Sequence, residues 1–249
     1  MALEKKYKIV MDGAGDAEIK VRKNIVRVPM KTAEENGVSP SPSDFFKRVA
    51  DEEHIYVITA SPNFWGSFDN ALCGKEAFLS NNKDRKVHVF NSQSVSGGEG
   101  LAAEKIIALE NAGKSFEDIV FETEKFISET STYIVPGSLS QLKGVRGGVK
   151  NIVSAVLDIE LLFELTDGEI IKIGQTFGLK RAVSLFAEKI IGKCEENGRE
   201  KILISHSGAA ESARRVANLI KERGFEVNVI KMGRLSAYYI GEGGMIAAF

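Results

Sequence analysis

The sequence predicts an α/β protein of two domains, with a Rossmann-like, mainly parallel sheet covered by helices on both faces in residues 1–130 and a mixed sheet in residues 131–249. Short apolar runs rich in Val and Ile alternate with longer amphipathic segments in the first half, which is typical of parallel strands joined by helices. In the second half, two β-prone runs meet at Asp167-Gly168. Because Asp-Gly favours a hairpin turn, the second sheet is expected to contain antiparallel strands.

Four runs in the first half are too short for helices and are buried-strand candidates. The predicted strands are Tyr7–Met11, Ile25–Met30, Ile55–Thr59 and Val87–Phe90. Helices are expected to begin at Ser43 and at Ser115, where a polar residue can cap the first turn. Between them, the spacing of apolar residues predicts a helix over Leu101–Asn111, with Gly113 as its stop signal.

The second half contains both helical and strand-like patterns. The predicted strands are Tyr133–Val135, Ile159–Leu165, Glu169–Ile173, Ile202–Ser205 and Val227–Ile230. The predicted helices are Leu139–Lys143, Leu179–Glu196 and Glu211–Glu222. We expect the residues that follow the last of these strands to form a glycine-rich tail.

Composition excludes several classes of protein. Of 249 residues, 43% are hydrophobic and 27% charged, which is typical of a globular chain. Lys and Arg number 33 against 34 Asp and Glu, so no bulk attraction to nucleic acid or an anionic membrane is expected. The two cysteines form no CxxC, and no apolar run suits a signal peptide or a membrane helix. These features predict a cytoplasmic protein without a transmembrane segment.

Motifs for metal binding and hydrolysis are missing from the sequence. The three histidines form neither HxH nor HExxH, so no metal site is predicted. His206 follows a predicted strand, at the edge of a sheet where ligands gather, although an imidazole that bonds a neighbouring loop is about twice as favoured. Cys73 has no visible activating partner, and Cys194 falls on the apolar face of a helix, so neither is a catalytic candidate.

Three stretches stand out for ligand binding. Ser96–Gly100 joins a strand to a helix, where backbone N–H groups can hold an anion, but tight-turn glycines are favoured about two to one. The glycines at 241–244 allow a close approach of another element or of a ligand. Tyr56–Asn70 carries the only tryptophan, Trp65, beside a glycine and hydroxyls at a strand end. Such a loop suits an amphipathic ligand, and a tryptophan packed into the domain explains it equally well.

Motifs along nearly the whole chain resemble those of the DegV family, two-domain α/β proteins that carry a fatty acid in a tunnel between the domains. The matching segments are Ile9–Gly13 with Asp16, Ile25–Met30, Pro40–Phe45, Phe90–Ser96, Gly144–Arg146, Leu157–Glu160 and Ile204–His206. The resemblance implies the two-domain fold and a long acyl chain as ligand, without a cofactor.

The family's head-group site is altered in this sequence. In the family, hydroxyls of TSQP and LSGT segments hold the carboxylate, with an arginine and a histidine near the opening. Here Trp65 replaces the LSGT serine, and Tyr239 replaces the histidine. The head-group residues implied by the resemblance are Ser39, Ser61, Trp65, Gly66, Ser67, Tyr239 and Gly241. Those implied near the site are Asp12, Ser92, Ser94, Arg146, Phe177 (beside the usual arginine position) and His206.

The resemblance implies a lipid-binding protein that presents a fatty acid to a separate acyl kinase and is not itself an enzyme. Burial of a sixteen-carbon chain would yield on the order of 10 kcal/mol gross, enough to drive binding with an altered head-group site. One alternative is a different amphipathic ligand, with Trp65 shortening or capping the tunnel. A less favoured alternative is an enzyme using Ser67, Tyr239 or His206, because no base–nucleophile pair is visible. The lipid hypothesis requires an apolar cleft between the domains.

Overall fold

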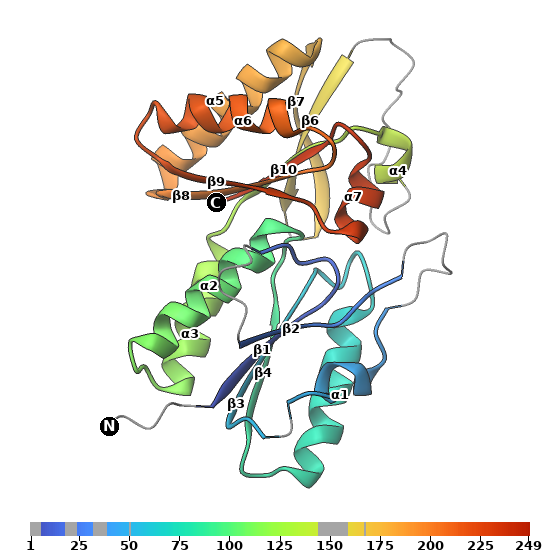
Figure 1. The fold of residues 1–249 in the computed structure, drawn as a ribbon, viewed down its shortest axis with the longest axis vertical. Coiled ribbons are helices and arrows are strands. Elements are labelled where there is room, and N and C mark those ends of the chain that lie inside the picture. Colours follow the sequence, from blue (N-terminus) through green and yellow to red (C-terminus); the bar gives the residue numbers. More distant parts are fainter. Residues whose placement is uncertain (1–5, 18–23, 32–38, 50, 144–158, 167) are drawn as a thin grey trace.

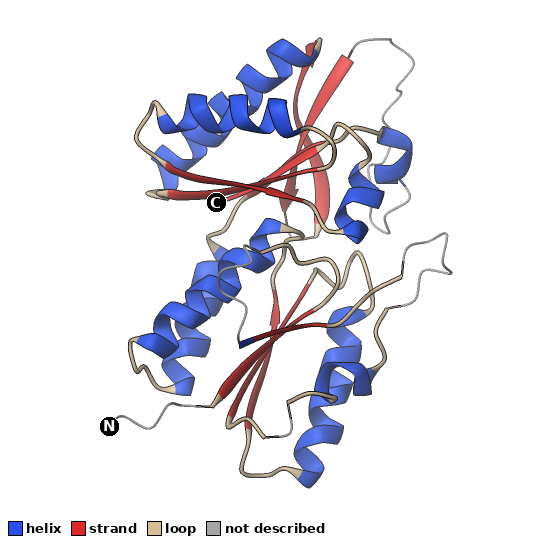
Figure 2. Ribbon diagram, in the orientation of Figure 1, coloured by secondary structure: helices blue, strands red, loops and turns tan. Residues whose placement is uncertain are grey.

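The computed structural model describes residues 6–17, 24–31, 39–49, 51–143, 159–166 and 168–249. These residues form two α/β units stacked end to end, each built on its own sheet (Figure 1). Helices flank both sheets, so each unit has three layers (Figure 2). The predicted two-domain α/β fold is therefore confirmed.

The N-terminal unit is a parallel sheet of four strands in the order β2-β1-β3-β4. Its strands are β1 (Tyr7–Met11), β2 (Ile25–Arg27), β3 (His54–Thr59) and β4 (Lys86–Asn91). Its helices are the short 3-10 helix η3 (Pro42–Phe46), α1 (Ser67–Asn81), α2 (Gly97–Asn111) and α3 (Phe116–Ser128). Because all four strands run the same way, their carboxyl ends meet at one edge, which faces the C-terminal unit (Figure 1).

Two apolar clusters hold the helices to the two faces of this sheet. On one face, Ile9 and Ile58 pack with Ile106 of α2 and Ile119 of α3. On the other face, strand residues such as Val57 pack with residues of η3 and α1. The central strand β3 is buried on both faces, which explains its unbroken apolar run.

The C-terminal unit is a mixed sheet of six strands in the order β7-β6-β5-β10-β8-β9. Its strands are β5 (Thr132–Val135), β6 (Ile159–Thr166), β7 (Glu169–Phe177), β8 (Lys201–His206), β9 (Glu226–Lys231) and β10 (Met245–Ala248). Its helices are α4 (Leu139–Lys143), α5 (Leu179–Asn197), α6 (Ala210–Lys221) and α7 (Arg234–Ile240). Only β8 and β9 pair in parallel, and the β6–β7 hairpin is antiparallel as predicted.

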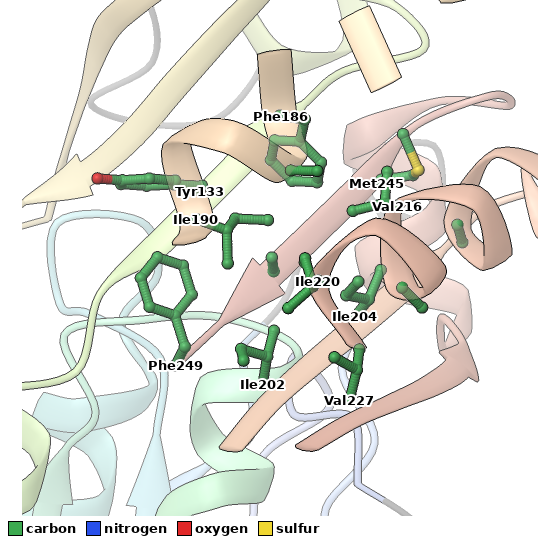
Figure 3. Close-up of a cluster of buried hydrophobic side chains, with 14 of the residues drawn as sticks. Tyr133, Phe186, Ile190, Ile202, Ile204, Val216, Ile220, Val227, Met245 and Phe249 are labelled. Atoms are coloured by element: carbon green, nitrogen blue, oxygen red, sulfur yellow. The ribbon is translucent and has the colours of Figure 1, made fainter. Parts of the chain in front are cut away.

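The largest apolar cluster lies between this sheet and helices α5 and α6. Phe186 and Ile190 of α5 meet Val216 and Ile220 of α6 over the sheet, and Phe249 closes one end (Figure 3). Cys194 is buried in the same cluster, so its predicted place in the core is confirmed. The opposite face of the sheet is covered by α4 and α7 and is turned toward the N-terminal unit.

Several predicted elements differ from those observed. The expected tail folds into α7 and the inner strand β10, whose residues pair with both β5 and β8. The expected helix at Ser43 is only the 3-10 turn η3, and β2 ends at Arg27 before Val28-Pro29. Strand β7 continues beyond Ile173 to Phe177, because it pairs with β6 along its whole length across a bulge. In β7 and β10, pairing with neighbouring strands produces strand structure that the local sequence pattern does not predict.

Candidate functional site

A small apolar cavity lies between the two units, at the carboxyl edge of the first sheet. Its volume is about 30 Å³. The N-terminal unit contributes Phe64, Trp65 and Val95 to its lining. The C-terminal unit contributes Ile134, Leu142, Leu165, Ile170, Ser236, Tyr239, Ile240 and Ile246. The open apolar cleft expected from the sequence is not seen here, because side chains close the seam and leave only this small cavity.

The cavity is too small to hold an acyl chain as it stands. Sites for small molecules and cofactors span roughly 300–1,000 Å³, about ten times the 30 Å³ found here. Aromatic rings account for part of the filling, because Trp65 lies across from Tyr239 with ring centroids 5.4 Å apart and touches Phe64 at 5.7 Å. Since Trp65 and Tyr239 belong to different units, a separation of the two rings would enlarge the cavity.

Trp65 lies in the loop that joins β3 to α1. The backbone N–H of Phe64 donates to the carbonyl of Ser61 at 3.0 Å, which makes a tight turn directly after the strand. That turn directs Phe64 and Trp65 toward the second unit, where both line the cavity. The sequence left two interpretations of Trp65 equally open, a residue that contacts a ligand and a residue packed into the protein. Both apply in part, because Trp65 is packed between the units and also forms a cavity wall.

Three of the predicted head-group residues lie together beside this loop. A Cβ added to Gly66 would lie 3.7 Å from the Ser39 hydroxyl oxygen, so Ser39 and Gly66 are close neighbours. Ser67 follows as the first residue of α1 and is fully buried. Its hydroxyl donates to the sulfur of Met30 at 3.4 Å. The arrangement offers two hydroxyls to a polar group.

Behind Ser67 lie three buried carboxyl groups, those of Asp12, Asp16 and Glu99. Burial is the largest cause of the raised pKa of each, since desolvation penalises the charged form. The pKa of Glu99 is raised well above its usual range, and the negative charges of Asp12 and Asp16 add to the effect. The pKa of Asp12 rises despite the backbone N–H groups of Ala14 and Ala60 that stabilise its carboxylate.

Asp16 joins the two units directly. Its Oδ1 accepts the backbone N–H of Gly233 at 2.7 Å, and its Oδ2 accepts the Ser96 hydroxyl at 2.7 Å. Ser96 in turn shares a 2.6 Å hydrogen bond with Ser205 at the end of β8. Nearby, the Ser236 hydroxyl of α7 donates to the Ala14 carbonyl at 3.0 Å. Residues 14–16, which follow β1, are thus fastened to the helix that carries Tyr239.

Other predicted head-group and near-site residues have contacts outside the cavity. Ser61 faces the β6–β7 turn, because a Cβ added to Gly168 would collide with its hydroxyl oxygen. Gly241 has φ +82° and packs against Ser138, so that even a Cβ would lie within 2.6 Å of the Ser138 Cβ. Ser92 and Ser94 form a turn after β4, with the Ser94 backbone N–H donating to the Ser92 hydroxyl at 3.2 Å. Each of these residues therefore has a structural role away from the cavity.

The remaining near-site predictions do not line the cavity. Phe177 ends β7 with 56% of its surface exposed. His206 ends β8, and burial lowers its pKa, with the nearby charges of Arg214 and Lys231 adding to the effect. Its Nδ1 has no hydrogen-bond partner among the described residues, so the loop-bonding role favoured from the sequence is not seen for that atom. Arg146 lies outside the described residues.

Sequence reasoning missed Glu99 and the apolar cavity residues of α7 and β10. The segment Ser96–Gly100 was considered only for its glycines, yet Glu99 is fully buried within it. A glutamate enclosed by three glycines at the start of a helix was the available signal. Within the described ranges, no cluster of His, Cys, Asp and Glu has the geometry of a metal site. No helix in the described part of the chain is long and apolar enough to span a bilayer.

Comparison with known proteins gives a consistent picture. A family model described as an uncharacterised protein of the DegV family matches residues 15–249. A DegV domain-containing protein of Streptococcus gordonii is 25% identical over 240 residues, covering 94% of this chain and 84% of the relative.

Solved structures match over almost the full length. A DegV family protein from Ruminococcus gnavus, refined with vaccenic acid, has a TM-score of 0.87 and 28% identity, covering 98% of this chain and 100% of its own. A Streptococcus pneumoniae Fatty Acid Kinase (Fak) B3 protein loaded with linoleic acid has a TM-score of 0.86 at 20% identity, covering 98% of this chain and 99% of its own. On the strength of the family match and the shared two-unit fold, this chain belongs to the DegV family.

Proposed function

We propose that this protein binds a long-chain fatty acid, or a lipid of similar shape, between its two units. The apolar cavity lined from both units carries the proposal, because it is the place where a hydrocarbon tail can be removed from water without a change of fold. The Ruminococcus gnavus relative, refined with vaccenic acid, supports the same ligand class. The role is binding rather than catalysis.

Binding requires the walls of the cavity to separate. Transfer of each CH₂ group out of water contributes about 0.8 kcal/mol. In this protein part of that gain is offset, because Trp65 and Tyr239 must exchange their mutual contact for contact with the ligand. The net affinity therefore depends on how easily these two rings move apart.

The polar end of the ligand would meet hydroxyls and no nearby cation among the described head-group residues. Ser39 and Tyr239 can donate or accept hydrogen bonds and Ser67 can accept them, whereas the buried Asp12 nearby disfavours a second negative charge. This setting favours a protonated carboxyl or an uncharged polar group over a carboxylate. A different amphipathic ligand with an uncharged end is the second candidate on the same grounds.

Lipid binding can be tested with the purified protein and one pair of variants. We expect mass spectrometry of its lipid extract to show a long acyl chain, and the delipidated protein to bind cis-parinaric acid. Trp65→Ser removes the indole from the cavity and should tighten binding about tenfold, or about 1.4 kcal/mol. Phe121→Ser, at a residue that is 72% exposed on α3, is the matched control and should leave binding unchanged. Absence of bound lipid together with no parinaric acid binding would reject the function.

We further propose that presentation of the lipid to an acyl kinase is inefficient in this protein. The name of the Streptococcus pneumoniae relative supports a kinase partner for the family. The histidine implied at the opening is replaced by Tyr239, which is buried against Trp65. We expect a fatty acid kinase to form acyl phosphate from this protein's lipid far more slowly than from a loaded relative. Equal rates in a direct kinase assay would contradict this.

A further inference from the structure

The side chain of Glu99 is an unusual buried group at the seam. It is fully buried, and neither of its carboxyl oxygens has a hydrogen-bond donor among the described residues. A Cβ added to Gly15 would lie 2.7 Å from Glu99 Oε2, so the β1–β2 loop presses directly on this carboxyl. A buried carboxylate without donors costs several kcal/mol, so Glu99 is protonated or displaced.

Asp12 is the carboxyl group that lies against Glu99. Asp12 Oδ1 accepts the Ala14 N–H at 2.9 Å, and Oδ2 accepts the Ala60 N–H at 3.2 Å. Both carboxyl groups are fully buried, and the negative charge of Asp12 acts on Glu99. Two carboxyl groups that share a buried site do not both ionise readily, so one of them carries a proton. Since Asp12 has two backbone donors and Glu99 has none, the proton resides on Glu99.

This pair supports a loop that fastens both walls of the cavity. Asp12 holds Ala60, which directly precedes the turn that places Trp65. Four residues further along the chain, Asp16 holds Gly233, the residue before α7 and its Tyr239. Glu99 therefore lies behind a single segment that positions both rings of the Trp65–Tyr239 contact.

We propose that Glu99 is a positioning residue of the lipid site, whose proton holds the loop segment of residues 12–17 in place and keeps the walls of the cavity together. Loss of the proton puts a second negative charge against Asp12, with Asp16 close by and Arg27 of β2 as the opposing cation. The loop then loosens, and Trp65 separates from Tyr239. The proposal rests on the proposed function only in assigning the walls to a lipid site.

Trp65 can report this movement directly because it is the only tryptophan of the chain. Tryptophan emission and its quenching by acrylamide should be followed in lipid-free protein from about pH 5 to about pH 9, a range above the usual pKa of a carboxyl group. We expect the emission of the wild type to shift to longer wavelength, and quenching to increase, as the pH rises. Glu99→Gln places a neutral group of similar shape against Asp12 without an ionisable proton, and it should hold the low-pH signal throughout.

Two further variants make the result decisive. Glu99→Ala removes the titratable group altogether, so its signal should show no transition over the same pH range. Glu110→Gln changes a glutamate at the other end of the same helix and should keep the wild-type profile. A flat wild-type profile, or a transition that persists in Glu99→Gln, would overturn the proposal. Parinaric acid binding, measured separately at neutral pH, tests the proposed function, so the failure of one is distinguishable from the failure of the other.

Discussion

Helix α2 carries a buried glutamate near each end, and the two are neutralised in different ways. At its carboxyl end, Glu110 Oε1 accepts the Tyr56 hydroxyl at 2.7 Å and lies 2.8 Å from His54 Nδ1. At its amino end, Glu99 has no donor among the described residues and lies against Asp12. The same residue type is thus satisfied by fixed donors at one end and by its own proton at the other.

The difference follows from where the two ends lie. The Glu110 group is contained within the N-terminal unit, where His54 opens β3 and Tyr56 stacks on Phe116. Burial and the neighbouring Glu110 carboxylate both raise the pKa of the Tyr56 hydroxyl, which keeps it a donor. Glu99 instead faces the edge of the sheet that meets the C-terminal unit. Fixed donors stabilise one end of α2, whereas a titratable contact at the other end leaves the seam free to respond to pH.

The strongest test of this contrast is removal of the Glu110 carboxylate. Glu110→Ala leaves a buried Tyr56 hydroxyl and the His54 ring without their acceptor, so we expect a loss of about 3 kcal/mol in the free energy of unfolding. Urea denaturation at neutral pH would measure this loss. Glu110→Gln retains an oxygen acceptor and should cost only about 1 kcal/mol. A smaller loss in the free energy of unfolding for Glu110→Ala than for Glu110→Gln would show that the Tyr56 and His54 side chains do not depend on Glu110. The contrast between the two ends of α2 would then be lost.

Much of the fold could be predicted because its signals are local. The apolar run of β3 and the Asp-Gly turn of the β6–β7 hairpin each lie within a few neighbouring residues. Strand β10 was missed because its four residues follow a glycine-rich stretch and gain strand structure only from β5 and β8 on either side. No local pattern records those partners.

The candidate site was predictable to a smaller extent. Trp65 and Ser67 were identified from the sequence, since an aromatic residue and a hydroxyl after a buried strand form a local signal. Glu99 was not, because its partner Asp12 comes from a distant strand end. The volume of the cavity was also beyond sequence reasoning, because it depends on how closely Trp65 and Tyr239 pack across the seam.

The smallest expected effect on stability is that of Glu99→Gln, at the amino end of α2. At about pH 5, Glu99 in the folded protein holds its proton, so Glu99→Gln replaces one neutral group by another of similar shape. We expect its free energy of unfolding to lie within about 0.5 kcal/mol of the wild type at that pH.

As the pH rises, the free energy of unfolding of Glu99→Gln should become larger than that of the wild type. Burial raises the pKa of Glu99 in the folded protein well above its ordinary value of 4.5, so the folded chain binds a proton that the unfolded chain has released. Wild-type stability contributed by this group is full below that value and falls by up to about 1.4 kcal/mol per pH unit until the folded pKa is passed. Asp12 and Asp16 add slopes of the same sign in both proteins. Urea denaturation at several pH values should therefore show the free energy of unfolding declining less steeply with pH for Glu99→Gln than for the wild type. Parallel curves for the two proteins would mean that Glu99 is already ionised, and the contrast between the two ends of α2 would be lost.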